Sequence, residues 1–193
     1  PRGLDVANIL RDDVEPGLLL KQAVTLHERD GQAGEPALLR PINRFGRMTV
    51  LENVMIGADH KGRTGIFSAL LRPPRVGREE RENRDRCLEV LSLFGERLLP
   101  RLQQPAGELS YANRRRVEIA RAMVSGPRLL LLDEPTAGMN PHETQQLVEL
   151  IRLIRSRGHS LLVIEHKMNV VMTVSDRIVV LDHGEKIAEG TPP

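Results

Sequence analysis

The chain of 193 residues is long enough for one sizeable core, or for one domain with part of a second, but too short for two complete domains. Hydrophobic residues make up 40% and charged residues 28%, an ordinary globular balance that excludes wholesale disorder. The net charge of +2 comes from interleaved basic and acidic residues, which indicates a solvated surface rather than a nucleic-acid stripe. Aromatic residues make up only 2%, which argues against a base-stacking platform.

Membrane-spanning and disulfide-rich classes are also excluded. The longest apolar runs, near residues 129–132 and 161–164, are far shorter than the ~20 residues that a transmembrane helix requires. We expect no secretory leader, because the first residues lack its pattern. The single Cys87 cannot build a disulfide framework, so we expect a reducing compartment.

The first part of the chain gives the weakest pattern. Turn-forming residues punctuate residues 1–36, and residues 17–24 fit either a short helix or a strand. Thr49 and Glu52 then have the spacing of a capping box, which predicts a short helix closed by Gly57.

Two longer helices are predicted next. Residues 78–94 have one apolar face and many charges in their first half, which predicts an amphipathic helix with Gly95 at its C-cap. Ser110 is a suitable N-cap for a helix over residues 111–124.

The last third of the chain alternates between strands and helices. The leucine run 129–132 predicts a strand buried on both faces, as in a parallel sheet. Residues 140–143 predict a helix start, with an N-cap, a proline at the first position and an acid at the third, and Gly158 ends this helix. This order predicts an α/β layered fold with a parallel core. The remaining predicted elements are strands over 161–165 and 178–181, a helix over 168–174, and a hairpin partner over 186–188.

Two adjacent carboxylates follow the leucine strand. Ligands of open α/β sheets lie beyond the carboxyl ends of the strands, so Asp133 and Glu134 suit a metal ion and a water molecule. Taken alone, the same residues also fit a buried strand capped by a solvated turn.

Four motifs in this order resemble the ATP-binding subunit of an ABC transporter. Residues 109–113 and the helix after them resemble the signature sequence, and residues 129–134 resemble the Walker B strand with its catalytic glutamate. Residues 137–140 stand where the D-loop belongs, and residues 163–166 match the strand of the switch histidine. The resemblance implies a P-loop NTPase-like ABC ATPase domain of the α/β class, with a helical signature subdomain and an incomplete N-terminus.

The finer resemblance is to the branched-chain amino acid importer ATPases, with relatives that serve urea or other amides left open. It is carried by residues 48–54, 65–71, 165–168 and 176–182. We expect three parts: residues 1–40, which do not match the family; residues 41–125, with the helical signature subdomain; and residues 126–193, with the Walker B, D-loop and switch-histidine core.

The resemblance implies ATP and Mg²⁺ as cofactors and assigns a role to each motif. Asp133 would belong to the Mg²⁺ shell, Glu134 would act as general base on the attacking water, and His166 would sense the γ-phosphate. The alternative for His166 is a histidine satisfied by local hydrogen bonds at a strand end. Ser110 and Asn140 would take part in nucleotide binding.

The N-terminus of a helix is an anion site, and the resemblance implies that this one, formed by Ser110, Tyr111, Ala112 and Asn113, faces the nucleotide of a second subunit. The family has two glycines where Tyr111 and Ala112 stand and a glutamine where Asn113 stands, and a Cβ at Ala112 is expected to crowd a phosphate. A plain N-cap is the other interpretation of Ser110.

The N-terminal departure from the family is larger. A phosphate-cradling Walker A loop has the pattern G-x-x-x-x-G-K-[S/T], and no lysine of this chain follows a glycine or precedes Ser or Thr. Residues 31–34 imitate the loop without its cation, no glutamine lies near Arg40 for a Q-loop, and no aromatic residue precedes Phe45 to stack adenine. We therefore expect this chain alone to bind ATP weakly.

The resemblance implies a subunit in the cytoplasm, peripheral on the inner face of the cell membrane. Its partners would be ABC permease subunits and a second ATP-binding subunit, in a homodimer or a heterodimer. One alternative is a non-catalytic remnant of an ABC ATPase without nucleotide binding. Another is a non-transport ABC ATPase of DNA repair or translation; the Arg114–Arg116 run suggests nucleic acid, but a solvated basic helix face is the favoured interpretation, and no nucleic acid is expected.

Overall fold

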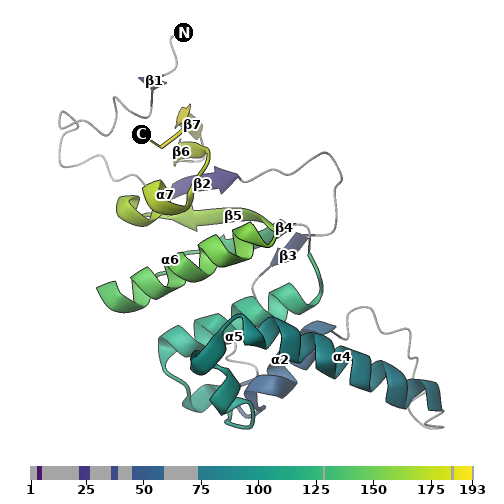
Figure 1. Ribbon diagram of the computed structural model, residues 1–193. Helices are drawn as coiled ribbons and strands as arrows, with labels where there is room; N and C mark the ends of the chain where they lie inside the picture. The colour runs from purple at the N-terminus through teal and green to yellow at the C-terminus, as the bar shows by residue number, and fades with distance from the viewer. Residues whose placement is uncertain are drawn as a thin grey trace. The chain divides into compact units, whose positions relative to one another are not determined.

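The computed structural model describes residues 4–5, 22–26, 36–38, 45–58, 74–127, 129–183 and 185–192 (Figure 1). The chain divides into two compact units. The first comprises Pro1–Pro36 with Arg128–Pro193 and contains most of the strands, and the second comprises Ala37–Pro127 and is mainly helical.

The first unit is built on a mixed β-sheet. The strand order is β1-β7-β6-β2-β5-β4-β3, and the division between the two units falls within β3. The strands are β1 (Leu4–Asp5), β2 (Gln22–Leu26), β3 (Pro36–Leu38), β4 (Leu129–Asp133), β5 (Ser160–Glu165), β6 (Ile178–Asp182) and β7 (Glu185–Gly190).

The predicted parallel core is correct only in part. β4 and β5 pair in parallel, with Leu130 opposite Leu161. β2 is antiparallel to both β5 and β6, so β4, β5 and β6 run in one direction while β2 lies reversed between β5 and β6. The sequence pattern of residues 17–24 could not distinguish a helix from a strand, so it could not predict this insertion. The predicted hairpin of β6 and β7 is confirmed.

The leucine strand is not buried equally on its two faces. Leu130 and Leu132 are each 1% exposed, whereas Leu129 and Leu131 are half-buried. This alternation corrects the prediction of a strand buried on both faces, because only one side of β4 is fully covered in the described structure.

Two helices of the first unit pack against each other. α6 (Pro141–Ser156) begins at the predicted capping box of Asn140 and Glu143, and the predicted apolar stripe of Leu147, Leu150, Ile151 and Ile154 is buried. α7 (Met168–Val174) contacts both α6 and β5. The left-handed φ of +90° at Gly158 follows α6, where the sequence predicted its end.

The second unit is organised around three helices. They are α2 (Val50–Ala58), α4 (Pro74–Ser92) and α5 (Tyr111–Val124), and α2 and α4 both pack against α5. Three short 3₁₀ turns connect α4 to α5: η3 (Gly95–Arg97), η4 (Leu99–Arg101) and η5 (Ala106–Glu108). The predicted capping box forms at α2, where the Thr49 amide donates to Glu52 at 2.8 Å and the Glu52 amide donates to the Thr49 hydroxyl at 3.2 Å.

Two predicted helix boundaries are wrong. α2 continues through Gly57 to Ala58, because Gly57 serves a close contact with α5 instead of a C-cap. α4 begins four residues before the predicted start, at Pro74, since proline suits the first turn of a helix. Gly95 has a left-handed φ of +47° in the turn after α4, which agrees with its predicted use near the helix end. In the described parts of the chain, no helix combines the length and apolarity that crossing a membrane requires.

Candidate functional site: the carboxyl ends of β4 and β5

Two predicted site residues, Asp133 and Glu134, lie at the carboxyl end of β4, beside the end of the parallel strand β5. Asp133 is the last residue of β4 and pairs with Ile164 of β5, and the Glu134 amide donates to the Ile164 carbonyl at 2.8 Å. Glu134 has a left-handed φ of +41°, which is unusual for a residue with a side chain and typical of functional turns. Glu134 therefore begins the loop after β4, directly beyond the last paired residue of the strand.

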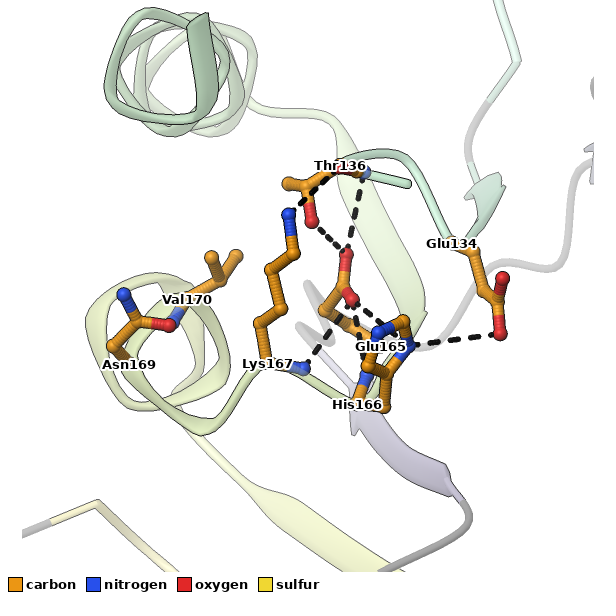
Figure 2. A network of polar contacts seen from close by, with 7 residues as sticks. All are labelled: Glu134, Thr136, Glu165, His166, Lys167, Asn169 and Val170. Carbon is orange, nitrogen blue, oxygen red and sulfur yellow. Dashed lines mark hydrogen bonds and ion pairs between the residues drawn. The ribbon is translucent and has the colours of Figure 1, made fainter. Parts of the chain in front are cut away.

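The imidazole of His166 lies beside the Glu134 carboxylate. Nδ1 of His166 is 3.6 Å from Oε1 of Glu134, and the two side chains are 48% and 52% exposed (Figure 2). A carboxylate and an imidazole at this distance, both open to solvent, can share a water molecule or a ligand oxygen. The structure thus brings together the two residues that the sequence proposed as catalytic.

Asp133 supplies a further exposed carboxylate at this edge. In the described parts of the chain, no group of three or more His, Cys, Asp or Glu side chains forms a ready-made metal site. Mg²⁺ is commonly held by one or two carboxylates together with substrate phosphates and water, so a single strand-end aspartate fits Mg²⁺ that arrives with a nucleotide. It does not fit a metal ion held by protein alone.

Sequence reasoning did not identify the role of Glu165, which is 1% exposed at the end of β5. Its Oε2 accepts from the Thr136 hydroxyl at 2.5 Å and from the Thr136 amide at 3.3 Å. Its Oε1 accepts from the amides of His166 and Lys167 at 3.0 and 3.3 Å. A signal was available, because Leu161, Val163 and Glu165 alternate onto one buried face of the strand.

The predicted signature residues lie in the second unit, at the start of α5. Ser110 is the N-cap, and its hydroxyl accepts from the Asn113 amide at 3.4 Å. Ser110 and Tyr111 are exposed, whereas Ala112 is only 2% exposed. The Cβ of Ala112 therefore points into the protein and is not part of the exposed helix end.

The arginine run that follows is not the solvated basic face that the sequence favoured. Arg116 is 4% exposed and donates to Oδ1 of Asn113 at 2.9 Å. Arg115 forms an ion pair with Glu118 at 2.9 Å, and its side chain is 16% exposed. Packing and local pairing thus occupy Arg115 and Arg116, so these two side chains do not form a solvated basic face.

Asn140 closes the loop that begins at Glu134. Its Oδ1 accepts from the Glu143 amide at 2.9 Å, and its own amide donates to the Glu143 carboxylate at 3.1 Å. The side chain therefore has a structural role as the cap of α6, while its predicted part in nucleotide binding stays a prediction. Residues 31–34, which imitate the Walker A loop, and Arg40, near the expected Q-loop, lie outside the described residues. Residues 65–71 of the finer resemblance also lie outside them.

Comparison with known proteins identifies the family. Residues 36–137 match the family described as ABC transporter. The chain belongs to the ABC transporter family. The high-affinity branched-chain amino acid transport ATP-binding protein LivG of Salmonella typhimurium is 41% identical over 179 residues, which are 88% of this chain and 69% of that protein. LivG of Escherichia coli K12 is 43% identical over 152 residues, or 78% of this chain and 59% of that protein.

Solved ABC cassettes have the same fold. An ATP-binding cassette of an ABC transporter has a TM-score of 0.66 at 29% identity, over 81% of this chain and 60% of that chain. A cassette solved as a dimer in a post-hydrolysis state bound to ADP and Pi has a TM-score of 0.62 at 25% identity, over 82% of this chain and 63% of that chain. The predicted ABC ATPase fold is confirmed, and this chain spans between 59% and 69% of the length of these ABC relatives.

Proposed function

We propose that the chain acts as the ATP-binding subunit of an ABC importer for branched-chain amino acids and couples ATP hydrolysis to transport. The observation that carries this proposal is the meeting of Glu134 and His166, 3.6 Å apart at the carboxyl ends of two parallel strands. The proposal is also supported by the relatives described above, which are branched-chain amino acid transport ATP-binding proteins.

Each residue at the strand ends has a distinct task in this proposal. Asp133 would hold a Mg²⁺ ion, which when bound with the nucleotide would offset the charge on its phosphates. Glu134 takes a proton from the attacking water and orients it. His166 donates a hydrogen bond toward the γ-phosphate oxygens and keeps Glu134 in place. The exposure of both side chains leaves room for these ligands.

The N-terminus of α5 serves a second nucleotide in this proposal. Ser110, Tyr111, Ala112 and Asn113 present the first turn of a helix, whose amides and dipole favour an anion. The anion would be the γ-phosphate bound by a second ATP-binding subunit, and Asn140 would approach the same interface. Both units of the chain therefore contribute, one to its own nucleotide and one to that of its partner.

The proposed partners are two ABC permease subunits and a second ATP-binding subunit, on the inner face of the cell membrane.

No G-x-x-x-x-G-K-[S/T] pattern occurs in the 193 residues, so no segment of this sequence has the glycines and the lysine that together would cradle the phosphates. We therefore propose that the chain alone binds ATP weakly and that binding improves in a mixture with an intact homologous subunit.

The test is a titration of Mg-ATP into the chain alone and then into an equimolar mixture with an intact homologous subunit. The proposal expects weak binding to the chain, and in the mixture more bound nucleotide and faster ATP turnover than the intact subunit gives by itself. Uptake of labelled leucine in cells that lack their own importer ATPase tests the solute. A mixture that behaves as the sum of its two components would contradict the proposal.

The same experiment decides the alternative of a non-catalytic remnant. A ligand that binds the native state must raise its stability. A midpoint for the thermal unfolding of this chain that does not change with Mg-ATP, either alone or in the mixture, would favour the remnant.

A further inference from the structure

Glu165 is a buried carboxylate that the proposed reaction does not use. Its side chain is fully covered, with a residue exposure of 1%. A charged group in such a place is stable only when hydrogen bonds replace the water that it lost. The partners that replace the water are therefore informative about the role of the residue.

All of the acceptor capacity of this carboxylate is used by two short segments. An ionised carboxylate has about four acceptor sites on its two oxygens. Oε2 accepts from the hydroxyl and the amide of Thr136, and Oε1 accepts from the amides of His166 and Lys167 (Figure 2). One oxygen thus holds the loop after β4, and the other holds the loop after β5.

A second tie joins the same two loops. Nζ of Lys167 donates to the carbonyl oxygen of Thr136 at 2.9 Å. Thr136 therefore has its hydroxyl, amide and carbonyl all bonded to residues 165 and 167. Thr136 itself is completely buried, so water does not compete for these bonds.

We propose that Glu165 is a positioning residue that fixes the loop carrying Glu134 to the loop carrying His166. Thr136 lies two residues after Glu134, and Glu165 directly precedes His166. The spacing of 3.6 Å between the Glu134 carboxylate and the His166 imidazole is then fixed by a buried carboxylate that holds both loops and that lies 3.4 Å from Nδ1 of His166. The catalytic roles of Glu134 and His166 rest on the proposed function, whereas the coupling of the two loops is a property of the chain without ligand.

Neither glutamine nor leucine could replace the carboxylate in this place. Glutamine has one acceptor oxygen, and its amide group would face the Thr136 amide or the amides of residues 166 and 167, which are all donors. Leucine would fill the space but would leave three backbone amides without an acceptor. No hydrogen bond joins Thr136 and His166 directly in the described structure. The proposal nevertheless predicts that weakening the bond between Thr136 and Glu165 changes the position of the His166 ring, because Glu165 links the two residues.

The experiment is nuclear magnetic resonance of the whole chain without nucleotide. It compares Thr136→Val, which removes the hydroxyl but keeps the shape, with Thr136→Ser, which keeps the hydroxyl. The control is Thr173→Val, which removes another threonine hydroxyl, bonded to the Asn169 carbonyl at 2.6 Å on α7. The two readouts are the ring resonances of His166 and the hydrogen-exchange rates of the amides of His166 and Lys167.

Thr136→Val is expected to displace the His166 ring resonances and to speed exchange of the two amides about three- to ten-fold, the range that one weakened hydrogen bond gives. Thr136→Ser and Thr173→Val are expected to resemble the wild type. Glu134→Gln is expected to perturb the His166 ring less in the Thr136→Val background than in the wild type, because the two side chains are no longer held together.

A folded Thr136→Val chain with wild-type His166 resonances and wild-type exchange would overturn the proposal. If Thr136→Val does not fold, Lys167→Met replaces it: displaced His166 resonances would then support the proposal, and unchanged ones would overturn it. Because no nucleotide is present, these outcomes are independent of whether the chain binds ATP. A mixture with the intact subunit that behaves as the sum of its two components, beside a displaced His166 ring, would contradict the proposed function alone.

Discussion

Gly57 of α2 lies against the carbonyl oxygen of Arg121 of α5. A Cβ added at Gly57 would stand 2.0 Å from that oxygen and 2.7 Å from Cγ1 of Val124. The obstacle at 2.0 Å is backbone, which cannot rotate away as a side chain can. The two helices can therefore pack at this distance only when residue 57 lacks a side chain.

Gly57→Ala is expected to destabilise the chain by about 3 kcal/mol, because the helices must separate to admit one methyl group. Gly77→Ala is the matched control, since Gly77 also lies inside a helix but a Cβ there meets no described atom within 4 Å. The control should be neutral or up to about 1 kcal/mol more stable, as alanine is the better helix former. Urea unfolding followed by the fluorescence of Tyr111, the only tyrosine in a chain without tryptophan, measures both.

The capping box of α2 makes stability depend on pH. The Thr49 amide, and after it the Thr49 hydroxyl, lower the pKa of the Glu52 carboxyl below its usual value of 4.5. Because the pKa is lower in the folded state, this contribution is complete above pH 4.5 and is lost as the pH falls through the folded-state pKa. Glu52→Gln should therefore be less stable than the wild type near pH 7, with a difference that shrinks on acidification below 4.5.

Unfolding midpoints at a series of pH values check this prediction. Glu108→Gln, at an exposed glutamate on η5 in the same unit, controls for the general effect of removing a negative charge. A difference between Glu52→Gln and the wild type that stays constant down to pH 3 would contradict the prediction.

The cap of α6 tests how much of the role of Asn140 is structural. Asn140→Ala removes the acceptor for the Glu143 amide and is expected to cost about 1 kcal/mol, whereas Asn140→Asp keeps a capping oxygen and should cost little. Urea unfolding monitored by circular dichroism measures the stability of both variants. If Asn140→Asp kept its stability but weakened nucleotide binding in the mixture of subunits, Asn140 would have a role at the nucleotide beyond the cap. Equal losses of stability in the two variants would contradict the cap.

The sequence was sufficient wherever a contact is local or follows from strand direction. Both capping boxes depend on a spacing of three residues, so they could be predicted at Thr49 and at Asn140. The approach of Glu134 to His166 could be predicted because each follows one of two neighbouring strands and parallel strands end at the same edge.

Features that depend on distant packing could not be predicted in the same way. Gly57 looked like a helix end because nothing in the sequence indicates that α5 passes 2.0 Å from its missing Cβ. The antiparallel β2 pairs with strands that follow it by more than 130 residues in the chain. Glu165 carries a weak signal in the alternation of β5, but its partner Thr136 is 29 residues away, and only the tertiary structure joins them.

The last prediction concerns chemistry at the strand ends. Glu134→Gln keeps the size of the side chain but cannot accept the proton of the attacking water, so ATP turnover by the mixture with an intact subunit is expected to lose the contribution of this chain, a factor of about 10² to 10⁴ at its site. Nucleotide binding should be retained or strengthened, because the charge repelled by the phosphates is removed. Glu185→Gln, at an exposed glutamate on β7, is the control and should leave turnover unchanged. Single-turnover measurements separate the two effects, and an equal loss of binding and turnover in Glu134→Gln would show that Glu134 holds the nucleotide and is not the base.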